Sequence, residues 1–257
     1  MQVLILAGGL GTRFGNITED IPKPMIRIGK YPMLIHIMDI YAKYGHREFY
    51  VALGYKGQKI KEYFKNFREK SKKSYLISKS GKYEKYFLPS RNWTVQLIET
   101  GKNTMTGGRV KIAIRYLSKE TFFLTYGDGL ADINLVKLLE CHKKNKRVLT
   151  MTAVHPPARF GELEINKNVV KSFEEKPQLQ KGWINGGFFV VEPVFAKYIE
   201  KNTTILEREP MKKLVLEKKL TAYKHESFWH CVDTKRDLDK ITGIYNFKKN
   251  KFDYQKI

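Results

Sequence analysis

The chain has 257 residues, of which 42% are hydrophobic, and its 48 Lys and Arg against 26 Asp and Glu give a formal net charge of +22. This length can bury the core of one large α/β domain or two small ones, and two distant cysteines, Cys141 and Cys231, argue against a disulfide framework or a zinc finger. No apolar run is long enough for a membrane span and no basic segment of a secretory signal opens the chain, so we expect a cytoplasmic protein without a membrane partner.

Strands and helices alternate along the first part of the chain. Periodicity predicts strands at 2–7, 48–53, 94–99, 121–126 and 148–154, and helices at 32–44, 57–68, 107–117 and 134–145. Helical crossovers imply parallel pairing. We therefore expect an α/β fold with a Rossmann-like, doubly wound, mostly parallel sheet and with ligands at the carboxyl ends of its strands.

The pattern changes after residue 155. Shorter strands are predicted at 161–165, 169–173, 187–191 and 220–224, and helices at 193–200 and 210–217. We interpret residues 1–240 as a single domain, with a core over 1–154 and a substrate-facing part over 155–240. The remaining residues, 241–257, form a basic tail that we expect to fray.

A glycine-rich loop follows the first predicted strand. It reads Gly8-Gly9-Leu10-Gly11-Thr12-Arg13. Closely spaced glycines let backbone N–H groups line a concavity that suits an anion, and Thr12 and Arg13 add a hydroxyl and a guanidinium. The loop matches neither the Walker motif nor the dinucleotide fingerprint. It predicts a phosphate-binding loop, and the alternative is a simple strand-to-helix turn.

A lysine lies between two prolines beyond this loop. Pro22 and Pro24 restrict the backbone and favour an extended conformation at Lys23. A long cation on a stiff segment is suited to neutralising phosphate charge. We therefore expect Lys23 to act at the same site.

Two aspartates follow strand-like segments. Asp128 lies between Gly127 and Gly129 at the end of the predicted strand 121–126, and Asp233 follows the aromatic segment 228–232. Mg²⁺ prefers one or two carboxylates together with substrate phosphates. The alternatives are an Asp-Gly turn for Asp128 and a helix cap for Asp233.

Three further segments carry polar groups suited to a ligand. Glu175 and Lys176 offer a carboxylate and a cation, and Asn185 with Gly186 offers an amide close to accessible backbone, although a bulged core strand explains the latter pair nearly as well. The run Thr106-Gly107-Gly108-Arg109 opens a predicted helix. It could form the wall of a base-binding site or simply start a helix.

Together these motifs resemble one family, the glucose-1-phosphate cytidylyltransferases within the sugar-1-phosphate nucleotidyltransferases. The resemblance covers residues 1–240 and is carried by Leu6 to Arg13, Pro22 to Met25, Gly54 to Gly57, Met105 to Arg109, Thr125 to Gly129, Pro157 to Gly161, Glu175 to Pro177, Ile184 to Phe189 and Phe228 to Thr234. The stretches 105–109 and 157–161 separate the cytidylyl branch from its relatives. The resemblance implies a GT-A-like fold and a homo-oligomer, either a hexamer or a tetramer.

The resemblance also implies a reaction and a set of roles. The phosphate of glucose 1-phosphate would attack CTP, with Mg²⁺, to give CDP-glucose and pyrophosphate. Lys23, Arg13 and Asp128 would be catalytic, and Asp128 with Asp233 would hold the metal. The nucleotide would be bound by Leu6, Ala7, Gly8, Gly9, Gly11, Thr12, Arg13, Lys23, Thr106, Gly107, Gly108, Arg109 and Asp128. The sugar phosphate would be bound by Tyr126, Gly127, Glu175, Lys176, Asn185 and Gly186.

Some alternatives stay open. The base could be another one, as in UTP or dTTP, the phosphate acceptor could differ, or the chain could be an idle regulator that binds nucleotide-sugar. The segment 56–91 carries 12 Lys and Arg against three Glu. It is either a solvated surface, a subunit contact or a funnel for anions. It lacks a recognition element for nucleic acid, so we expect no nucleic-acid partner.

Overall fold

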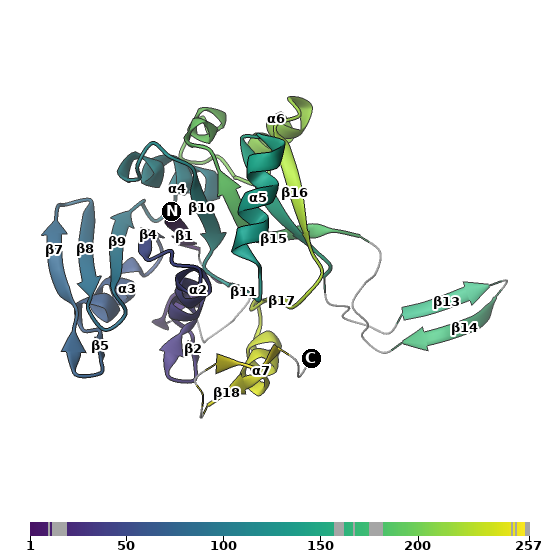
Figure 1. Cartoon of the computed structure of the whole chain (residues 1–257), viewed down its shortest axis with the longest axis horizontal. Helices are drawn as coiled ribbons and strands as arrows, with labels where there is room; N and C mark the ends of the chain where they lie inside the picture. The colour runs from purple at the N-terminus through teal and green to yellow at the C-terminus, as the bar shows by residue number, and fades with distance from the viewer. Residues whose placement is uncertain are drawn as a thin grey trace.

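A computed structural model describes residues 1–9, 11, 20–156, 162–166, 168–174, 182–247, 249 and 251–254. Its centre is a sheet of nine strands: β1 (Gln2–Ala7), β4 (Glu48–Leu53), β7 (Tyr75–Lys79), β8 (Tyr83–Leu88), β9 (Trp93–Glu99), β10 (Phe122–Tyr126), β12 (Leu149–Val154), β15 (Ile184–Val191) and β16 (Leu220–His225). Their spatial order is β16-β12-β15-β10-β1-β4-β9-β8-β7 (Figure 1).

The sheet confirms the predicted fold class and is mixed in its pairing. Strands β10, β1, β4 and β9 form a parallel core, and β12 pairs with β16 in parallel. Strand β15 runs antiparallel between β10 and β12, and β8 and β7 are antiparallel additions beyond β9. The turns that join β7, β8 and β9 are too short for a parallel crossover, which needs a dozen residues or more. The sequence pattern did not predict β7 and β8.

Helices cover both faces of the sheet. The α-helices are α2 (Met33–Ala42), α3 (Gly57–Lys65), α4 (Thr106–Ala113), α5 (Leu135–Asn145), α6 (Glu209–Leu216) and α7 (Lys235–Gly243), and the 3-10 turns are η2 (Lys23–Met25), η3 (Ile114–Tyr116) and η4 (Pro193–Tyr198). One buried cluster joins α2, α3, α5 and α7 to the sheet, and a second joins α4, η4 and α6. The helix predicted at 193–200 is a 3-10 turn. The other predicted helices contain α-helices, but the one at 107–117 ends in the 3-10 turn η3 and the one at 57–68 ends at Lys65.

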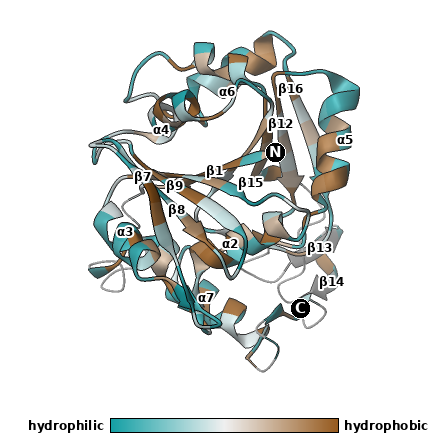
Figure 2. Cartoon of the chain, turned by 60° about the vertical axis from the view of Figure 1, so that its left-hand side comes forward, coloured by the Kyte–Doolittle hydropathy of each residue, from teal (hydrophilic) through white to brown (hydrophobic). Residues whose placement is uncertain are grey.

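The core follows from alternation along the strands. In β1, Val3 and Ile5 belong to the first cluster, while Leu4 and Leu6 belong to the second. Side chains of a strand point alternately to the two faces, so a strand covered by helices on both faces is apolar throughout. Figure 2 shows this distribution, with largely hydrophobic central strands and hydrophilic loops.

Short two-stranded ladders complete the fold. They pair β2 (Arg27–Ile28) with β3 (Tyr31–Pro32), β5 (Arg68–Glu69) with β6 (Lys72–Lys73), β11 (Gly129–Ala131) with β17 (Trp229–Cys231), β13 (Glu162–Asn166) with β14 (Val169–Glu174), and β18 (Tyr245–Asn246) with β19 (Lys251–Phe252). The β13–β14 hairpin extends away from the body (Figure 1).

The described part of the basic tail packs against the body. The Phe252 ring lies 5.0 Å from the His36 ring, and the Tyr254 ring stacks 4.7 Å from Phe228, centroid to centroid. The expectation of a frayed tail is therefore wrong for residues 251–254, because their aromatic side chains anchor them.

The basic segment 56–91 forms α3, the β5–β6 hairpin and the antiparallel edge of the sheet. Part of its positive charge is paired with carboxylates of the same chain. Arg91 pairs with Asp39 at 2.7 Å and with Glu69 at 2.9 Å, and its guanidinium lies over the Trp93 ring. Among the helices described here, none is both long and apolar enough to cross a bilayer.

Candidate active site

The described site residues gather at the carboxyl edge of the parallel core. Leu6 and Ala7 end β1, and Leu6 pairs with Tyr126 at the end of β10. Gly8 and Gly9 continue from β1, Gly127 and Asp128 continue from β10, and Asn185 and Gly186 lie at the start of the antiparallel β15. Gly11 adopts a left-handed conformation with φ of 67°. Thr12, Arg13, Glu175 and Lys176 lie outside the described residues, as does the stretch 157–161.

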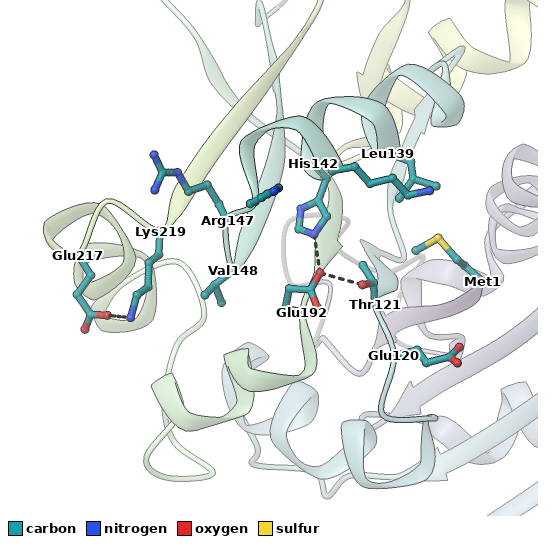
Figure 3. A pocket seen from close by; sticks show the side chains of 12 residues that line it. Met1, Glu120, Thr121, Leu139, His142, Arg147, Val148, Glu192, Glu217 and Lys219 are labelled. Atoms are coloured by element: carbon teal, nitrogen blue, oxygen red, sulfur yellow. Dashed lines mark hydrogen bonds and ion pairs between the residues drawn. The ribbon is translucent and has the colours of Figure 1, made fainter.

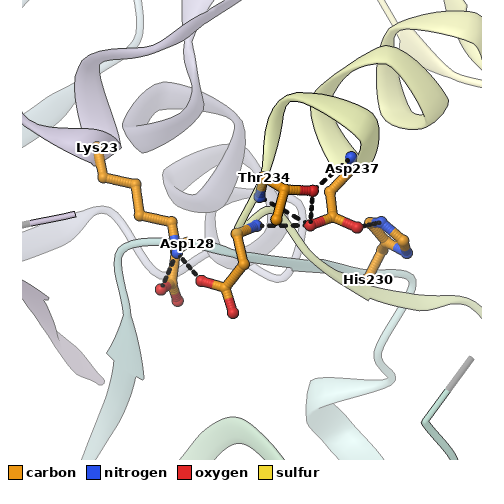
Figure 4. A network of polar contacts seen from close by, with 6 residues as sticks. Lys23, Asp128, His230, Thr234 and Asp237 are labelled. Carbon is orange, nitrogen blue, oxygen red and sulfur yellow. Dashed lines mark hydrogen bonds and ion pairs between the residues drawn. The ribbon is translucent and has the colours of Figure 1, made fainter. Parts of the chain in front are cut away.

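Lys23, Asp128 and Asp233 form what we call the cation centre. The Lys23 ammonium donates to Asp128 Oδ2 at 2.7 Å and also to Asp233 Oδ1 (Figure 4). Lys23 itself is 9% exposed. Three segments that are far apart in the sequence thus meet at one cation.

The local backbone differs from the extended form expected at Lys23. Pro22 is extended, with ψ of 147°, but Lys23 opens the turn η2, which the Met25 N–H closes by donating to the Pro22 carbonyl at 2.8 Å. The prolines still restrict the segment, and they position Lys23 through a tight turn.

Charge stabilises the ammonium despite its burial. Burial alone would lower the pKa of Lys23, but attraction to Asp128 and hydrogen bonds to Asp128 and Asp233 outweigh it, so its pKa lies above the ordinary value. Lys23 is therefore held as a cation. Burial raises the pKa of the neighbouring Cys231 thiol, and the Asp128 carboxylate raises it further.

Asp233 is delivered by the start of α7 but does not cap it. Thr234 is the N-cap, and its hydroxyl accepts from the Asp237 N–H in a capping box. The Asp237 carboxylate accepts from the backbone N–H groups of Asp233 and Thr234 at 3.1 and 2.8 Å (Figure 4). Because these contacts satisfy the helix start, the carboxylate of Asp233 remains directed at Lys23.

Arg109 lies beneath the glycine loop. Its Nη2 donates to the Gly8 carbonyl at 3.0 Å, and its Nη1 donates to the Leu53 carbonyl at 3.0 Å and to the Thr100 hydroxyl at 2.7 Å. The carbonyls of Gly101 and Lys102 accept as well. Arg109 is 4% exposed and, among the described residues, its guanidinium has no carboxylate partner. Burial lowers the pKa of Arg109.

Two glycines make room for this guanidinium. A Cβ at Gly8 would lie 2.4 Å from Arg109 Cζ, and a Cβ at Gly54 would lie 2.3 Å from Arg109 Nη1. Both distances are far inside contact range, so any side chain there would displace the guanidinium. We call Gly8, Gly54 and Arg109 the guanidinium layer. In this structure Arg109 contacts the backbone around the loop, where the sequence suggested a base-site wall.

The start of α4 packs against the loop 201–208. A Cβ at Gly108 would lie 2.1 Å from the Asn202 carbonyl oxygen, and one at Gly107 would lie 2.8 Å from that of Thr204. The Thr106 hydroxyl donates to Glu207 Oε2 at 2.8 Å. The two glycines thus permit close packing of backbone on backbone within the chain.

Glu207 is a site residue that the sequence did not single out. The Tyr126 hydroxyl donates to Glu207 Oε1 at 2.5 Å, and Asn185 Nδ2 donates to the same hydroxyl at 3.2 Å. Burial raises the pKa of Tyr126, and Glu207 raises it further. Glu207 therefore links the predicted sugar side of the site, Tyr126 and Asn185, to the start of α4.

A separate cavity of about 780 Å³ lies near the amino end of β10 (Figure 3). His142 is buried in its wall and contacts the Thr150 hydroxyl and Glu192 Oε1, both at 2.9 Å. Glu192 also accepts from the Thr121 hydroxyl at 2.8 Å. None of the predicted site residues lines this cavity, which is bordered by Met1, Glu120, Thr121, Leu139, His142, Lys143, Lys146, Arg147, Val148, Glu192, Glu217 and Lys219.

The cation centre fits a divalent metal. Asp128 and Asp233 each offer a carboxylate oxygen, and Cys231 Sγ lies in the same cluster, with all three ligand atoms within 4.8 Å of one another. The Lys23 ammonium already lies against both carboxylates, which shows that the spot attracts a cation.

Known proteins match this chain over nearly its whole length. The family model described as nucleotidyl transferase matches residues 2–255. The chain is 42% identical over 247 residues to the probable glucose-1-phosphate cytidylyltransferase of Bacillus subtilis (strain 168), covering 96% of each chain. It is 41% identical to the glucose-1-phosphate cytidylyltransferase of Salmonella typhimurium, covering 95% of this chain and 96% of the relative.

Solved structures share the fold. A putative glucose-1-phosphate thymidylyltransferase from Bacillus anthracis, in complex with a sucrose, aligns with a TM-score of 0.71 at 15% identity and covers 99% of this chain and 98% of its own. A UDP-glucose pyrophosphorylase complexed with UDP-glucose aligns with a TM-score of 0.69 at 17% identity, covering 96% and 98%. The resemblance carried by the motifs is confirmed, and the chain belongs to the nucleotidyl transferase family, in which it groups with the glucose-1-phosphate cytidylyltransferases.

Proposed function

We propose that this chain transfers a cytidylyl group from CTP to glucose 1-phosphate, forming CDP-glucose and pyrophosphate. The observation that carries the proposal is the convergence of Lys23, Asp128 and Asp233 at one cation centre beside the glycine loop. The names of the relatives at 41% and 42% identity support the choice of CTP and glucose 1-phosphate.

In the reaction, a phosphate oxygen of glucose 1-phosphate attacks the α-phosphorus of CTP. The bond from that phosphorus to the bridging oxygen of the β-phosphate breaks, and pyrophosphate leaves with the electron pair. Such a transfer needs in-line positioning and neutralisation of charge rather than covalent chemistry from the protein. Residues that hold phosphates and residues that carry fixed positive charge are therefore the ones that matter.

Lys23 has the charge and the position for the main electrostatic role. Its buried ammonium lies at the carboxyl edge, where the α-phosphate would bind, and it is held by Asp128 and Asp233. We assign to it the neutralisation of charge that grows on the α-phosphate. Gly8, Gly9 and Gly11, with Thr12 and Arg13, would hold the triphosphate through backbone N–H groups and side chains.

Asp128 and Asp233 would hold Mg²⁺, for which carboxylates and phosphates are the preferred ligands. The bound ion would supply positive charge to the phosphates of CTP. The remaining roles follow the resemblance. Lys176 would bind the sugar phosphate. The sugar would be bound by Glu175 and Asn185, with Tyr126, Gly127 and Gly186 around them. The nucleotide would also be bound by Thr106, Gly107, Gly108 and Arg109.

The proposal includes a homo-oligomer and a cytoplasmic location, both of which stay predictions. Transfer of another nucleotidyl group, as from UTP or dTTP, is less supported by the named relatives. Another phosphate acceptor remains the alternative to test, because a few contacts decide which sugar is bound.

The test is pyrophosphate release with Mg²⁺ across CTP, UTP, dTTP, ATP and GTP, each with glucose 1-phosphate and with a panel of other sugar 1-phosphates. We expect release with CTP and glucose 1-phosphate well above all other pairs. Preference for another pair would keep the chemistry and reject the assignment of substrates. No release from any pair by a folded protein would reject the proposed reaction.

A further inference from the structure

Cys231 lies beside both carboxylates of the cation centre. One ligand atom from each of Asp128, Cys231 and Asp233 lies within 4.8 Å of the other two. All three residues are partly exposed, so an ion from solvent can reach them. The centre is therefore not built from oxygen alone.

The backbone fixes the position of the thiol. Cys231 pairs with Gly129 in the β11–β17 ladder, and the Val232 N–H donates to the Asp128 carbonyl at 2.9 Å. Val232 is fully buried, while Cys231 and Asp233 on either side of it are partly exposed. This alternation turns the thiol and the Asp233 carboxylate to the same side of the chain.

Sulfur changes which ions the centre can select. Carboxylate oxygens suit Mg²⁺, whereas a thiolate selects Zn²⁺ and other soft cations. Three protein ligands with an open fourth position are typical of zinc sites that exchange ligands. The Lys23 ammonium lies against Asp128 and Asp233, so an incoming ion has to take its place between the two carboxylates.

We propose that Cys231 gives this centre a second binding mode, in which Asp128, Cys231 and Asp233 together bind a thiophilic divalent cation such as Zn²⁺. A metal–sulfur bond forms, and the thiol proton leaves to solvent. The ion displaces the Lys23 ammonium and competes with Mg²⁺, so it inhibits the reaction. Only this last step rests on the proposed function.

The test uses Co²⁺ as a spectroscopic probe on the metal-free protein, without nucleotide. Wild type is expected to develop the near-ultraviolet charge-transfer band of a cobalt–thiolate bond, and Zn²⁺ is expected to abolish it by displacement. The matched variants are Cys231→Ser, which should lose the band, and Cys141→Ser, on α5, which should keep it. No band in wild type, or a band that persists in Cys231→Ser, would overturn the proposal.

A second measurement needs no variant. Alkylation of the two cysteines is followed by peptide mapping with and without Cd²⁺. Because the free thiolate is the nucleophile, we expect Cd²⁺ to slow alkylation of Cys231 and to leave that of Cys141 unaffected, and we expect a chelator to reverse the effect. Equal effects on both cysteines, or none, would reject the site. Because neither measurement involves turnover, a thiolate band in a protein that releases no pyrophosphate would reject the proposed function alone.

Discussion

Two buried cations serve this site, and they are compensated in opposite ways. Lys23 is 9% exposed and lies against two carboxylates, whereas Arg109 is 4% exposed and is surrounded by backbone carbonyls and one hydroxyl. Carboxylates can exchange one cation for another. A buried carbonyl that loses its only donor costs free energy, so the donors around it are best held in place.

The contrast separates the cation centre, whose ion pairs can change during the reaction, from the guanidinium layer, whose hydrogen bonds hold the backbone in place. The cation centre can reorganise when metal and phosphates bind, because the carboxylates of Asp128 and Asp233 can pair either with the Lys23 ammonium or with a metal ion. The guanidinium layer holds the Gly8 end of the loop to Leu53 at the end of β4. Its charge is not neutralised by a carboxylate among the described residues, so it adds positive potential beneath the proposed phosphate loop.

The largest effect is expected from Lys23→Ala. If Lys23 neutralises charge that develops in the transition state, kcat should fall by roughly 10²–10³-fold, while the KM for CTP changes much less. Steady-state kinetics measures both values. The matched control is Lys59→Ala on α3, because Lys59 is exposed and, among the residues that the structure describes, its one ion pair is with Glu62 at 4.0 Å. A rise in KM at unchanged kcat would assign Lys23 to ground-state binding instead.

Arg109→Met should act mainly on stability. It removes the charged hydrogen bonds that the guanidinium donates to the carbonyls of Gly8, Leu53 and Gly101, at a cost of about 3 kcal/mol or more in free energy of unfolding. The carbonyls of Gly8 and Leu53 keep the backbone N–H groups of Tyr55 and Thr100 as donors, whereas that of Gly101 loses its donor. Denaturant unfolding measures this loss. Arg109→Lys keeps the charge but loses the planar fork, so it should be intermediate. If Arg109→Met unfolds with wild-type stability, the guanidinium does not hold the layer together.

Gly54→Ala tests the same layer with one methyl group. The added Cβ would lie 2.3 Å from Arg109 Nη1, and relief of that overlap should cost about 1–3 kcal/mol. Gly81→Ala is the matched control, because a Cβ there meets nothing within 4 Å. Thermal unfolding of the two variants gives the comparison, and equal melting temperatures would contradict the packing argument.

The smallest effect is expected from pH. The pKa of Lys23 in the folded state lies above its ordinary value of 10.5, so its ion pairs contribute fully below pH 10.5 and are lost as pH rises beyond that value. The stability difference between wild type and Lys23→Met should therefore shrink above pH 10.5. Denaturant unfolding across neutral and alkaline pH measures it. A constant difference would mean that the ammonium contributes by packing alone.

The cation centre could be predicted from the sequence because its residues follow strand ends. Asp128 follows β10, the glycine loop follows β1, and these two strands pair in parallel. The pattern of strands therefore already implied that Asp128 lies close to the glycine loop. Lys23 was found from the prolines around it, although they impose a tight turn rather than an extended backbone. Local chemistry and strand order were sufficient here.

The guanidinium layer and Glu207 could not be predicted in the same way. Arg109 was singled out, but its contacts with Leu53 and Gly8 depend on where three loops meet. Glu207 lies 81 residues from Tyr126 in an irregular loop without periodicity. Strands β7 and β8 were missed because neither alternates between apolar and polar residues: β7 opens with three consecutive apolar residues, all exposed, and β8 has the charged Glu84 on its buried face. Strand β15 was placed correctly as a strand, but its antiparallel direction depends on tertiary contacts.

The position of β15 has a consequence for a chain that is made from its N-terminus. Strands β10 and β12 are both synthesised before β15, yet β15 lies between them. Until the ribosome has passed residue 191, each of these strands has an edge with no partner, which can pair with another nascent chain. Asp233 is synthesised later still, so the cation centre is assembled only after all nine strands of the sheet have been made.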